Sequence, residues 1–262
     1  MSFPFTLPEQ PEHAGRLPAE TQVVVIGGGV IGVTTALYLA RAGVPVVLLE
    51  KGRVAAEQSS RNWGWIRVQG RDMAEIPVAL EAQRLWQDLN ADCGGRLGVK
   101  RVGVTYLARN DADMQAYAGW LNEAAPFGLS SYLLDRTDLA THLPGARGRW
   151  AGALVTPPDL RGEPWQAVPE LARLAKAEGA QIVERCAVRA LDIEAGRITG
   201  VMTEQGRIAC GEVVLAAGAW SALFLRRHGI ALPQLSVRSP AFETGPLPQV
   251  SGTAAVDDRL AW

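Results

Sequence analysis

Hydrophobic positions between residues 22 and 50 follow three successive patterns. Residues 22–26 form a short, apolar, β-branched run, which predicts a parallel strand buried on both faces. After three glycines, residues 30–42 resume at a helical period, with Ile31, Thr35 and Leu39 spaced by four. A second apolar run, 46–49, ends at Glu50. The pattern predicts a strand, a turn, a helix and a strand.

The same stretch also contains eighteen uncharged residues in succession, VVVIGGGVIGVTTALYLA, a length typical of a membrane helix. Three consecutive glycines near its start favour the strand–turn–helix–strand interpretation, because that arrangement uses them as the turn. Gly43 stands where a glycine commonly ends a helix. We therefore expect no transmembrane segment.

Further elements follow the same rules. Residues 74–89 place Val78, Ala82, Leu85 and Leu89 on one helical face. Residues 101–108 alternate as a strand with Val102, Val104 and Tyr106 on one side, and Asp111 is expected to cap a helix that runs to residue 122. Residues 213–215 predict a buried strand.

Composition excludes several classes of protein. The 262 residues are 48% hydrophobic, enough for a core, and 26 basic against 27 acidic residues leave a formal charge of −1. Such a balance favours neither nucleic acid nor an anionic membrane as the main partner. Three cysteines and three histidines lie scattered, without the spacing of a metal site. Without a signal peptide pattern, the cytoplasm is expected, with peripheral attachment at the inner membrane left open.

Gly27, Gly29 and Gly32 form a GxGxxG motif at the predicted turn. Gly27 permits the turn, Gly29 lets backbone approach a pyrophosphate, and Gly32 lets helix and strand pack closely. The helix N-terminus then offers N–H groups and partial positive charge to phosphates. Glu50, eighteen residues later, suits the two ribose hydroxyls and disfavours NADP. The motif alone does not separate FAD from NAD.

Residues 57–72, EQSSRNWGWIRVQGRD, are small, polar and irregular. One interpretation is a solvated loop in which Trp63 and Trp65 pack locally. The other is a second cofactor loop, whose small residues admit a flavin while Ser and Asn side chains donate hydrogen bonds.

Four blocks in this order resemble the FAD-dependent amine and D-amino-acid oxidoreductases, a family that includes D-amino-acid dehydrogenases, glycine and sarcosine oxidases and opine dehydrogenases. The blocks are VVVIGGGVIGVTTALYLARAGVPVVLLEK, SSRNWGW, GALVTPPDLRGEPWQAVPELARLAKAEGAQIVERCAVRAL and EVVLAAGAWS. The resemblance implies an α/β (α+β overall) fold, with a Rossmann-like FAD-binding domain and an inserted antiparallel-sheet substrate domain. It implies a flexible lead-in over 1–20, FAD-binding parts over 21–90 and 151–224, and substrate-domain parts over 91–150 and 225–262, the last of them incomplete.

The resemblance also implies roles for individual residues. Non-covalent FAD would contact the glycine motif, the end of the second strand, the SSRNWGW loop and the AAGAWS turn. These cofactor candidates are Gly27, Gly29, Val30, Ile31, Gly32, Glu50, Lys51, Ser60, Arg61, Asn62, Gly64, Val188, Ala217, Gly218 and Trp220. Val188 also fits an ordinary core position in a strand.

Chemistry of this type transfers a hydride from the carbon bearing the amine to flavin N5, after which the imine hydrolyses. No catalytic residue is assigned and no metal is expected. An arginine fork would hold a substrate carboxylate, and an aromatic wall its side chain. The substrate candidates are Arg67, Arg71, Tyr106 and Arg238.

Three interpretations stay open. The first is an FAD-dependent amine or D-amino-acid oxidoreductase. The second is a non-catalytic FAD-binding fragment or subunit, because family members continue beyond residue 262 and a partner chain could supply that part. The third is an NAD-dependent dehydrogenase. Oxygen, a quinone and a partner subunit all stay open as electron acceptors.

Overall fold

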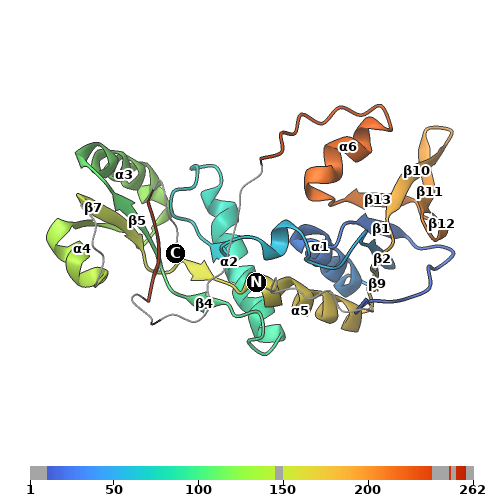
Figure 1. Ribbon diagram of the computed structural model, residues 1–262, viewed down its shortest axis with the longest axis horizontal. Helices are drawn as coiled ribbons and strands as arrows, with labels where there is room; N and C mark the ends of the chain where they lie inside the picture. Colours follow the sequence, from blue (N-terminus) through green and yellow to red (C-terminus); the bar gives the residue numbers. More distant parts are fainter. Residues whose placement is uncertain (1–10, 145–149, 238–247, 249–251, 258–262) are drawn as a thin grey trace. The chain divides into compact units, whose positions relative to one another are not determined.

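The computed structural model describes residues 11–144, 150–237, 248 and 252–257, which divide into two units (Figure 1). The first unit comprises Met1–Asn62 and Pro164–Ala241, and the second comprises Trp63–Glu163 and Phe242–Trp262. The chain thus leaves the first unit at Asn62, earlier than the boundary at 90 that the sequence suggested, because α2 contacts β3 of the second unit. It returns after Glu163, later than the expected boundary at 150, because β7 and β8 pair within the second unit's sheets.

The first unit is built on a four-stranded parallel sheet in the order β13–β1–β2–β9, accompanied by a three-stranded antiparallel sheet, β10–β11–β12. Helices α1 and α5 contact each other. The elements are β1 (Val23–Ile26), α1 (Val30–Arg41), β2 (Val46–Leu49), η1 (Gln58–Ser60), α5 (Pro164–Ala177), β9 (Gln181–Val183), β10 (Val188–Glu194), β11 (Arg197–Thr203), β12 (Gly206–Ala209), β13 (Glu212–Leu215), η3 (Gly218–Trp220) and α6 (Ser221–Arg226).

The strand–turn–helix–strand prediction is confirmed. β1 and β2 are entirely buried, as a parallel strand covered on both faces requires, and their register pairs Val23 with Val46. The buried side of α1 differs from the expected one: Val33, Ala36 and Leu37 are inside, whereas Ile31 is 65% exposed. The helical period was therefore right, but its phase was wrong.

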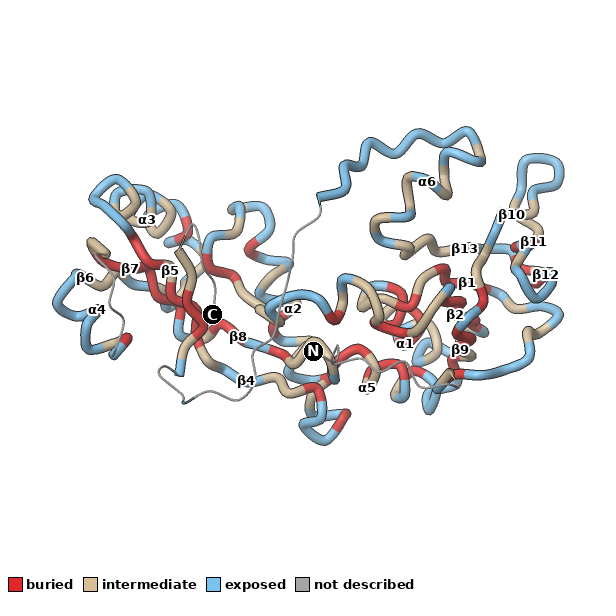
Figure 2. Tube along the Cα trace, viewed as in Figure 1, coloured by how far each residue is buried: buried red, intermediate tan, exposed pale blue. Residues whose placement is uncertain are grey.

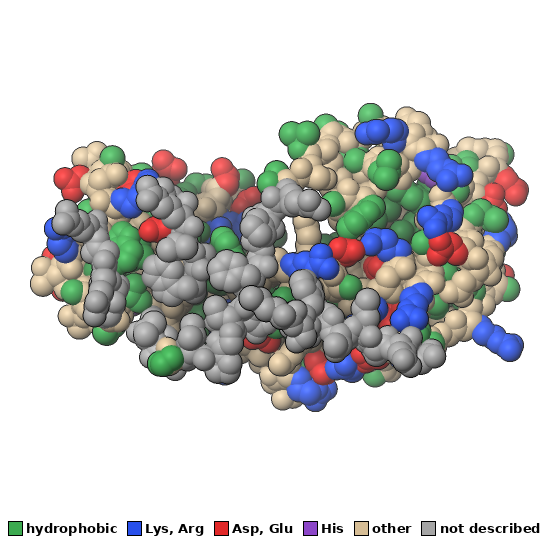
Figure 3. Space-filling view, viewed as in Figure 1, with side chains coloured by type: hydrophobic (Ala, Val, Ile, Leu, Met, Phe, Trp, Pro, Cys, Tyr) green, Lys and Arg blue, Asp and Glu red, His purple; other side chains and the backbone are tan. Residues whose placement is uncertain are grey.

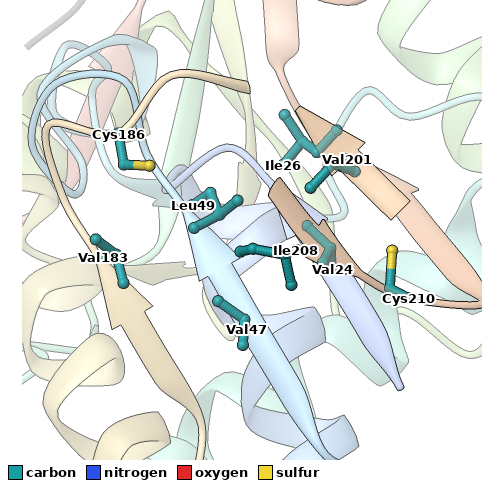
Figure 4. Packing of buried hydrophobic residues seen from close by; sticks show 9 residues of the cluster. All are labelled: Val24, Ile26, Val47, Leu49, Val183, Cys186, Val201, Ile208 and Cys210. Atoms are coloured by element: carbon teal, nitrogen blue, oxygen red, sulfur yellow. The ribbon is translucent and has the colours of Figure 1, made fainter. Parts of the chain in front are cut away.

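One face of the parallel sheet packs on the antiparallel sheet. Figure 4 shows side chains of β1, β2 and β9 meeting those of β11 and β12, and Figure 2 shows β1, β2 and β9 as buried chain. The three cysteines are buried and form no disulfide. The cluster comprises Val24, Ile26, Val47, Leu49, Val183, Cys186, Val201, Ile208 and Cys210.

Residues 11–21 are bound to the first unit. The carboxylate of Glu184 accepts a hydrogen bond from the His13 backbone at 3.1 Å, and the Glu184 N–H donates to the His13 carbonyl at 3.0 Å. Backbone hydrogen bonds of 2.9 Å join Ala19 and Thr21 to Ala209. Residues 11–20 therefore contrast with the flexible lead-in expected for 1–20.

The second unit contains a mixed sheet in the order β14–β5–β7–β6 and a small sheet in the order β3–β8–β4. β5–β7 and β6–β7 are antiparallel, as expected for this part, whereas β14 pairs parallel with β5. The elements are β3 (Trp65–Ile66), α2 (Ile76–Asp92), β4 (Lys100–Arg101), β5 (Val104–Ala108), α3 (Asp111–Ala124), η2 (Ala125–Phe127), β6 (Tyr132–Asp135), α4 (Arg136–His142), β7 (Gly152–Thr156), β8 (Leu160–Arg161) and β14 (Ala254–Val256).

Three local predictions in this unit were wrong. The strand expected over 101–108 is split, because Gly103 has φ +69° and interrupts it between β4 and β5. Asn110 rather than Asp111 caps α3, since its side chain accepts the Asp113 N–H at 2.9 Å. In α2, Val78 is 72% exposed.

The substrate candidate Arg238 lies outside the described residues. Within the described ranges, no helix combines the length and the apolar character that crossing a membrane requires.

Candidate functional site

The candidate cofactor site lies at the carboxyl ends of β1, β2 and β13. β1 occupies the position between β2 and β13 at which the chain order reverses, where α/β sheets commonly bind ligands. Gly27 follows β1 with φ +112°, and its N–H donates to the Leu49 carbonyl at 2.9 Å. A Cβ on Gly27 would stand 2.5 Å from the Ala216 carbonyl oxygen, so only glycine fits beside the end of β13.

Gly32 completes the packing of the turn. A Cβ there would lie 1.9 Å from the Gly27 carbonyl oxygen, so the first turn of α1 touches backbone directly. This is the close approach that the sequence motif predicts for its third glycine. The structure therefore brings Gly27, Gly32 and the end of β13 together.

The N-terminus of α1 is open to an anion. Gly29 is the N-cap residue and provides no side-chain cap, while the Val30 N–H donates to the Ser59 hydroxyl at 2.9 Å. First-turn N–H groups lack acceptors within the helix and carry its positive dipole end. A Cβ at Gly27 or Gly32 would also clash with backbone oxygens of the turn. These features fit a dinucleotide pyrophosphate. Of the two predicted residues, Ile31 could offer its N–H to it, whereas the Val30 N–H is engaged by Ser59.

Glu50 is buried, and its carboxylate joins two turns. One oxygen accepts the Gly28 N–H and the other the Gly52 N–H, each at 2.7 Å. A carboxylate has roughly four acceptor positions, so capacity for ribose hydroxyls remains. The acid predicted to bind ribose thus also fixes the glycine turn to the end of β2.

Lys51 and Arg61 both pair with one carboxylate. The Lys51 ammonium lies 2.7 Å from Glu57, and the Arg61 guanidinium lies 3.5 Å from the other oxygen of Glu57. Lys51 also stands 4.1 Å from the centroid of the Trp220 ring, which extends from the AAGAWS turn. Two of the predicted cofactor residues, Lys51 and Arg61, therefore pair with Glu57, a residue that sequence reasoning missed, and Trp220 contacts Lys51.

The SSRNWGW loop contributes differently from the expectation. Ser60 is fully buried and donates to the Glu57 carbonyl, whereas its neighbour Ser59 reaches the helix N-terminus. Asn62 folds its amide back onto the carbonyls of Gln58 and Ser59, each at 3.0 Å. The adjacent serines are equivalent in the sequence, so only the 3₁₀ turn decides which of them faces α1.

The remaining cofactor candidates fall into three places. Ala217 and Gly218 follow β13, and the Cα of Ala217 lies 3.2 Å from the Cβ position of Gly27. Val188 begins β10 and packs partly buried against the core, as its alternative interpretation predicts. Gly64 belongs to the second unit, where its carbonyl accepts from Gly162 at 2.8 Å.

Arg67 and Tyr106, two of the substrate candidates, lie together in the second unit. The Arg67 guanidinium carbon is 5.5 Å from the Tyr106 ring centroid, and Arg67 also donates to the Gln69 carbonyl. Burial raises the pKa of Tyr106, while the Arg67 charge opposes the rise. Arg71 is engaged elsewhere, in an exposed ion pair with Glu75 at 3.3 Å.

Asp159, which sequence reasoning also missed, organises this part of the second unit. Its carboxylate is fully buried and accepts hydrogen bonds from the Val68 N–H at 2.8 Å, the Gln69 N–H at 3.3 Å and the Gln83 amide at 2.7 Å. Burial raises the pKa of Asp159, and these donors oppose the rise. The carboxylate thereby fixes the segment that follows Arg67.

Comparisons with known proteins give one family. The family model described as FAD dependent oxidoreductase matches residues 22–260. The mitochondrial pyruvate dehydrogenase phosphatase regulatory subunit of Mus musculus is 29% identical over 211 residues, covering 80% of this chain and 24% of that protein. The D-amino acid dehydrogenase of Rhizobium johnstonii is 26% identical over 273 residues, covering 83% of this chain and 66% of that protein.

Among solved structures, L-amino acid deaminase from Proteus myxofaciens in complex with anthranilate superposes with a TM-score of 0.80 at 33% identity. The match covers 84% of this chain and 51% of that chain. The chain thus spans between 24% and 66% of the length of these three relatives.

Proposed function

Because the chain belongs to the FAD dependent oxidoreductase family, we propose that it supplies the FAD-binding part of an enzyme that oxidises the C–N bond of an amino acid or secondary amine. The observation that carries the proposal is the glycine turn at the α1 N-terminus. Added Cβ atoms at Gly32 and Gly27 would lie 1.9 Å and 2.5 Å from backbone oxygens, so the turn packs α1 and the end of β13 together as the dinucleotide-binding glycine motif requires. The family's dependence on FAD favours this cofactor over the NAD alternative.

The chain's own residues divide the binding work. Of the first-turn N–H groups of α1, that of Val30 already donates to Ser59. Those of Ile31 and Gly32 would therefore hold the diphosphate at the positive end of the helix dipole. Glu50 accepts from the ribose hydroxyls while its bonds to Gly28 and Gly52 keep the turn in shape. When bound, FAD would supply the redox chemistry by accepting a hydride from the carbon bearing the amine, and water would hydrolyse the resulting imine.

Arg67 is our preferred candidate for the substrate carboxylate. Its guanidinium is held against the Tyr106 ring and the Gln69 carbonyl, so it loses less conformational freedom on binding an anion than a mobile surface arginine does. Relatives named as D-amino acid dehydrogenase and L-amino acid deaminase support an amino-acid substrate. Arg71 and Arg238 stay as the alternative cations, and the electron acceptor is oxygen, a quinone or a partner subunit.

A second candidate function is a non-catalytic FAD-binding subunit. One relative that covers 80% of this chain is named as a regulatory subunit, and the chain spans 24% of its length. In that case a partner polypeptide would complete the fold. Co-purification of a second chain, with flavin present and no reduction by any amine, would favour this candidate.

The test is an absorption spectrum of the purified chain before and after heat release, with bands near about 370 and 450 nm expected for oxidised flavin. Bleaching on anaerobic addition of D-amino acids, L-amino acids or sarcosine would establish catalysis by the chain itself. Arg67→Lys is the matched variant. It should retain the flavin bands while the amine concentration needed for half-maximal bleaching rises, because lysine cannot form the two-point contact. A chain that stays colourless with added FAD would refute the proposal.

A further inference from the structure

Two basic side chains beside the glycine turn, Lys51 and Arg61, pair with one carboxylate of the same chain, Glu57. Glu57 lies between Lys51 at 2.7 Å and Arg61 at 3.5 Å, and all three side chains are about half exposed. On the face drawn in Figure 3, basic and acidic side chains are interspersed over the first unit, so such pairs are common there. The cluster of Lys51, Glu57 and Arg61 differs from the other ion pairs because it lies beside the glycine turn.

Each member of the cluster is attached to the turn that would hold the diphosphate. Lys51 directly follows Glu50, which accepts the Gly28 N–H. Arg61 and Glu57 flank η1, whose Ser59 accepts the Val30 N–H at 2.9 Å. Glu57 therefore precedes the 3₁₀ helix whose Ser59 contacts the α1 N-terminus.

The Glu57 side chain does not cap the 3₁₀ helix that it precedes. Glu57 is the N-cap of η1, but its side chain makes no capping hydrogen bond, and its carbonyl alone receives the Ser60 N–H and hydroxyl. Its carboxylate is instead occupied by two cations. An acid that pairs with two cations beside an anion site competes with the anion for them.

We propose that Glu57 competes with the cofactor's diphosphate for Lys51 and Arg61 and thereby sets the affinity for FAD. The inference rests on the proposed FAD binding. When FAD binds, its diphosphate takes over part of the pairing with these cations, and the Glu57 charge opposes it. Glu57 is thus an affinity-determining residue that touches the cations rather than the reacting atoms.

The expected size follows from Coulomb's law. In water, one unit charge about 10 Å from a doubly charged diphosphate changes an equilibrium constant by about fourfold. Glu57→Gln keeps the shape and removes the charge. At about 10 mM salt, where the screening length is about 30 Å, FAD should therefore bind about threefold more tightly. At about 1 M salt, where the screening length is about 3 Å, the difference should disappear. Lys51→Gln should weaken binding at low salt.

The experiment titrates apoprotein with FAD and follows the flavin fluorescence, which reports binding independently of activity. Glu178→Gln is the matched control. It removes one acid of similar exposure from an ion pair with Arg41, in the last turn of α1, and should leave the dissociation constant within twofold. Equal or weaker binding by Glu57→Gln at low salt, with the parent binding FAD, would overturn this inference alone. A parent that binds no FAD would overturn the proposed function as well.

Discussion

Two helical glycines should respond in opposite ways to the same substitution. Gly32 lies in the first turn of α1, where a Cβ would stand 1.9 Å from the Gly27 carbonyl oxygen. Gly119 lies in the middle of α3, where a Cβ would meet nothing within 4 Å. Gly32→Ala should destabilise the protein and abolish FAD binding, whereas Gly119→Ala should stabilise it.

The magnitudes follow from the contacts. To restore the 3.0 Å that real Cβ contacts keep, the Gly32 Cβ and the Gly27 oxygen must separate by about 1.1 Å. Overpacking of this kind costs up to about 3 kcal/mol, against which alanine gains about 1 kcal/mol of helix propensity. The net loss for Gly32→Ala is about 2 kcal/mol. For Gly119→Ala only the gain of about 1 kcal/mol remains.

Urea unfolding followed by far-UV circular dichroism measures the change in stability of both variants. FAD titration measures the loss of FAD binding in Gly32→Ala. Because the displaced group is the glycine turn itself, FAD binding should fall further than the loss of stability alone explains. The reasoning is refuted if Gly32→Ala unfolds within about 0.5 kcal/mol of the parent and binds FAD normally. A loss of stability in Gly119→Ala would refute the other half.

Three further predictions concern single side chains. Ala195 has φ +50° in the hairpin between β10 and β11, so Ala195→Asn should raise the free energy of unfolding by about 1 kcal/mol, measured in urea. Burial, with help from the Asp113 charge, raises the pKa of Tyr117 to about 12. The raised pKa stabilises the fold fully below pH 10, and this contribution is lost as the pH rises towards 12. Because Tyr117 is partly exposed, this contribution to the free energy of unfolding is about 1 kcal/mol. The parent should therefore lose more stability than Tyr117→Phe between about pH 9 and about pH 11. Asp159→Asn should lower the free energy of unfolding in urea by about 2 kcal/mol, because the new NH₂ group would face N–H groups that now donate to the carboxylate. An unchanged unfolding midpoint would contradict this.

Local pattern was enough to predict the strand–turn–helix–strand segment at the candidate cofactor site. β1, α1 and β2 follow from buried β-branched runs and a glycine turn, because their periods and breakers are encoded within a few residues. The phase of α1 was not predictable in this way. It depends on packing against α5, which lies more than 120 residues later in the chain.

The residues that sequence reasoning missed owe their roles to contacts between distant segments. Asp159 follows two prolines and is typical of a surface turn, yet it binds backbone some 90 residues earlier. Ser59 and Ser60 are adjacent and chemically identical, and the geometry of η1 alone selects the one that reaches α1. The role of Glu57 could not be predicted from the sequence, because it depends on the positions of Lys51 and Arg61 in the folded structure.

The pairing of β1 with β13 also constrains how the chain folds during its synthesis. Val23 is paired with Glu212, 189 residues further on, and β1 stands between β13 and β2 in the sheet. At a ribosomal rate of about 5–20 residues per second, β1 waits about 10–40 s for that neighbour. Residues 63–163 emerge in the interval, and they hold every described strand of the second unit except β14, so this part of the second unit is expected to fold first. Until β13 emerges, the apolar β1 strand is unpaired on one side, so we expect chaperones to bind this segment of the nascent chain.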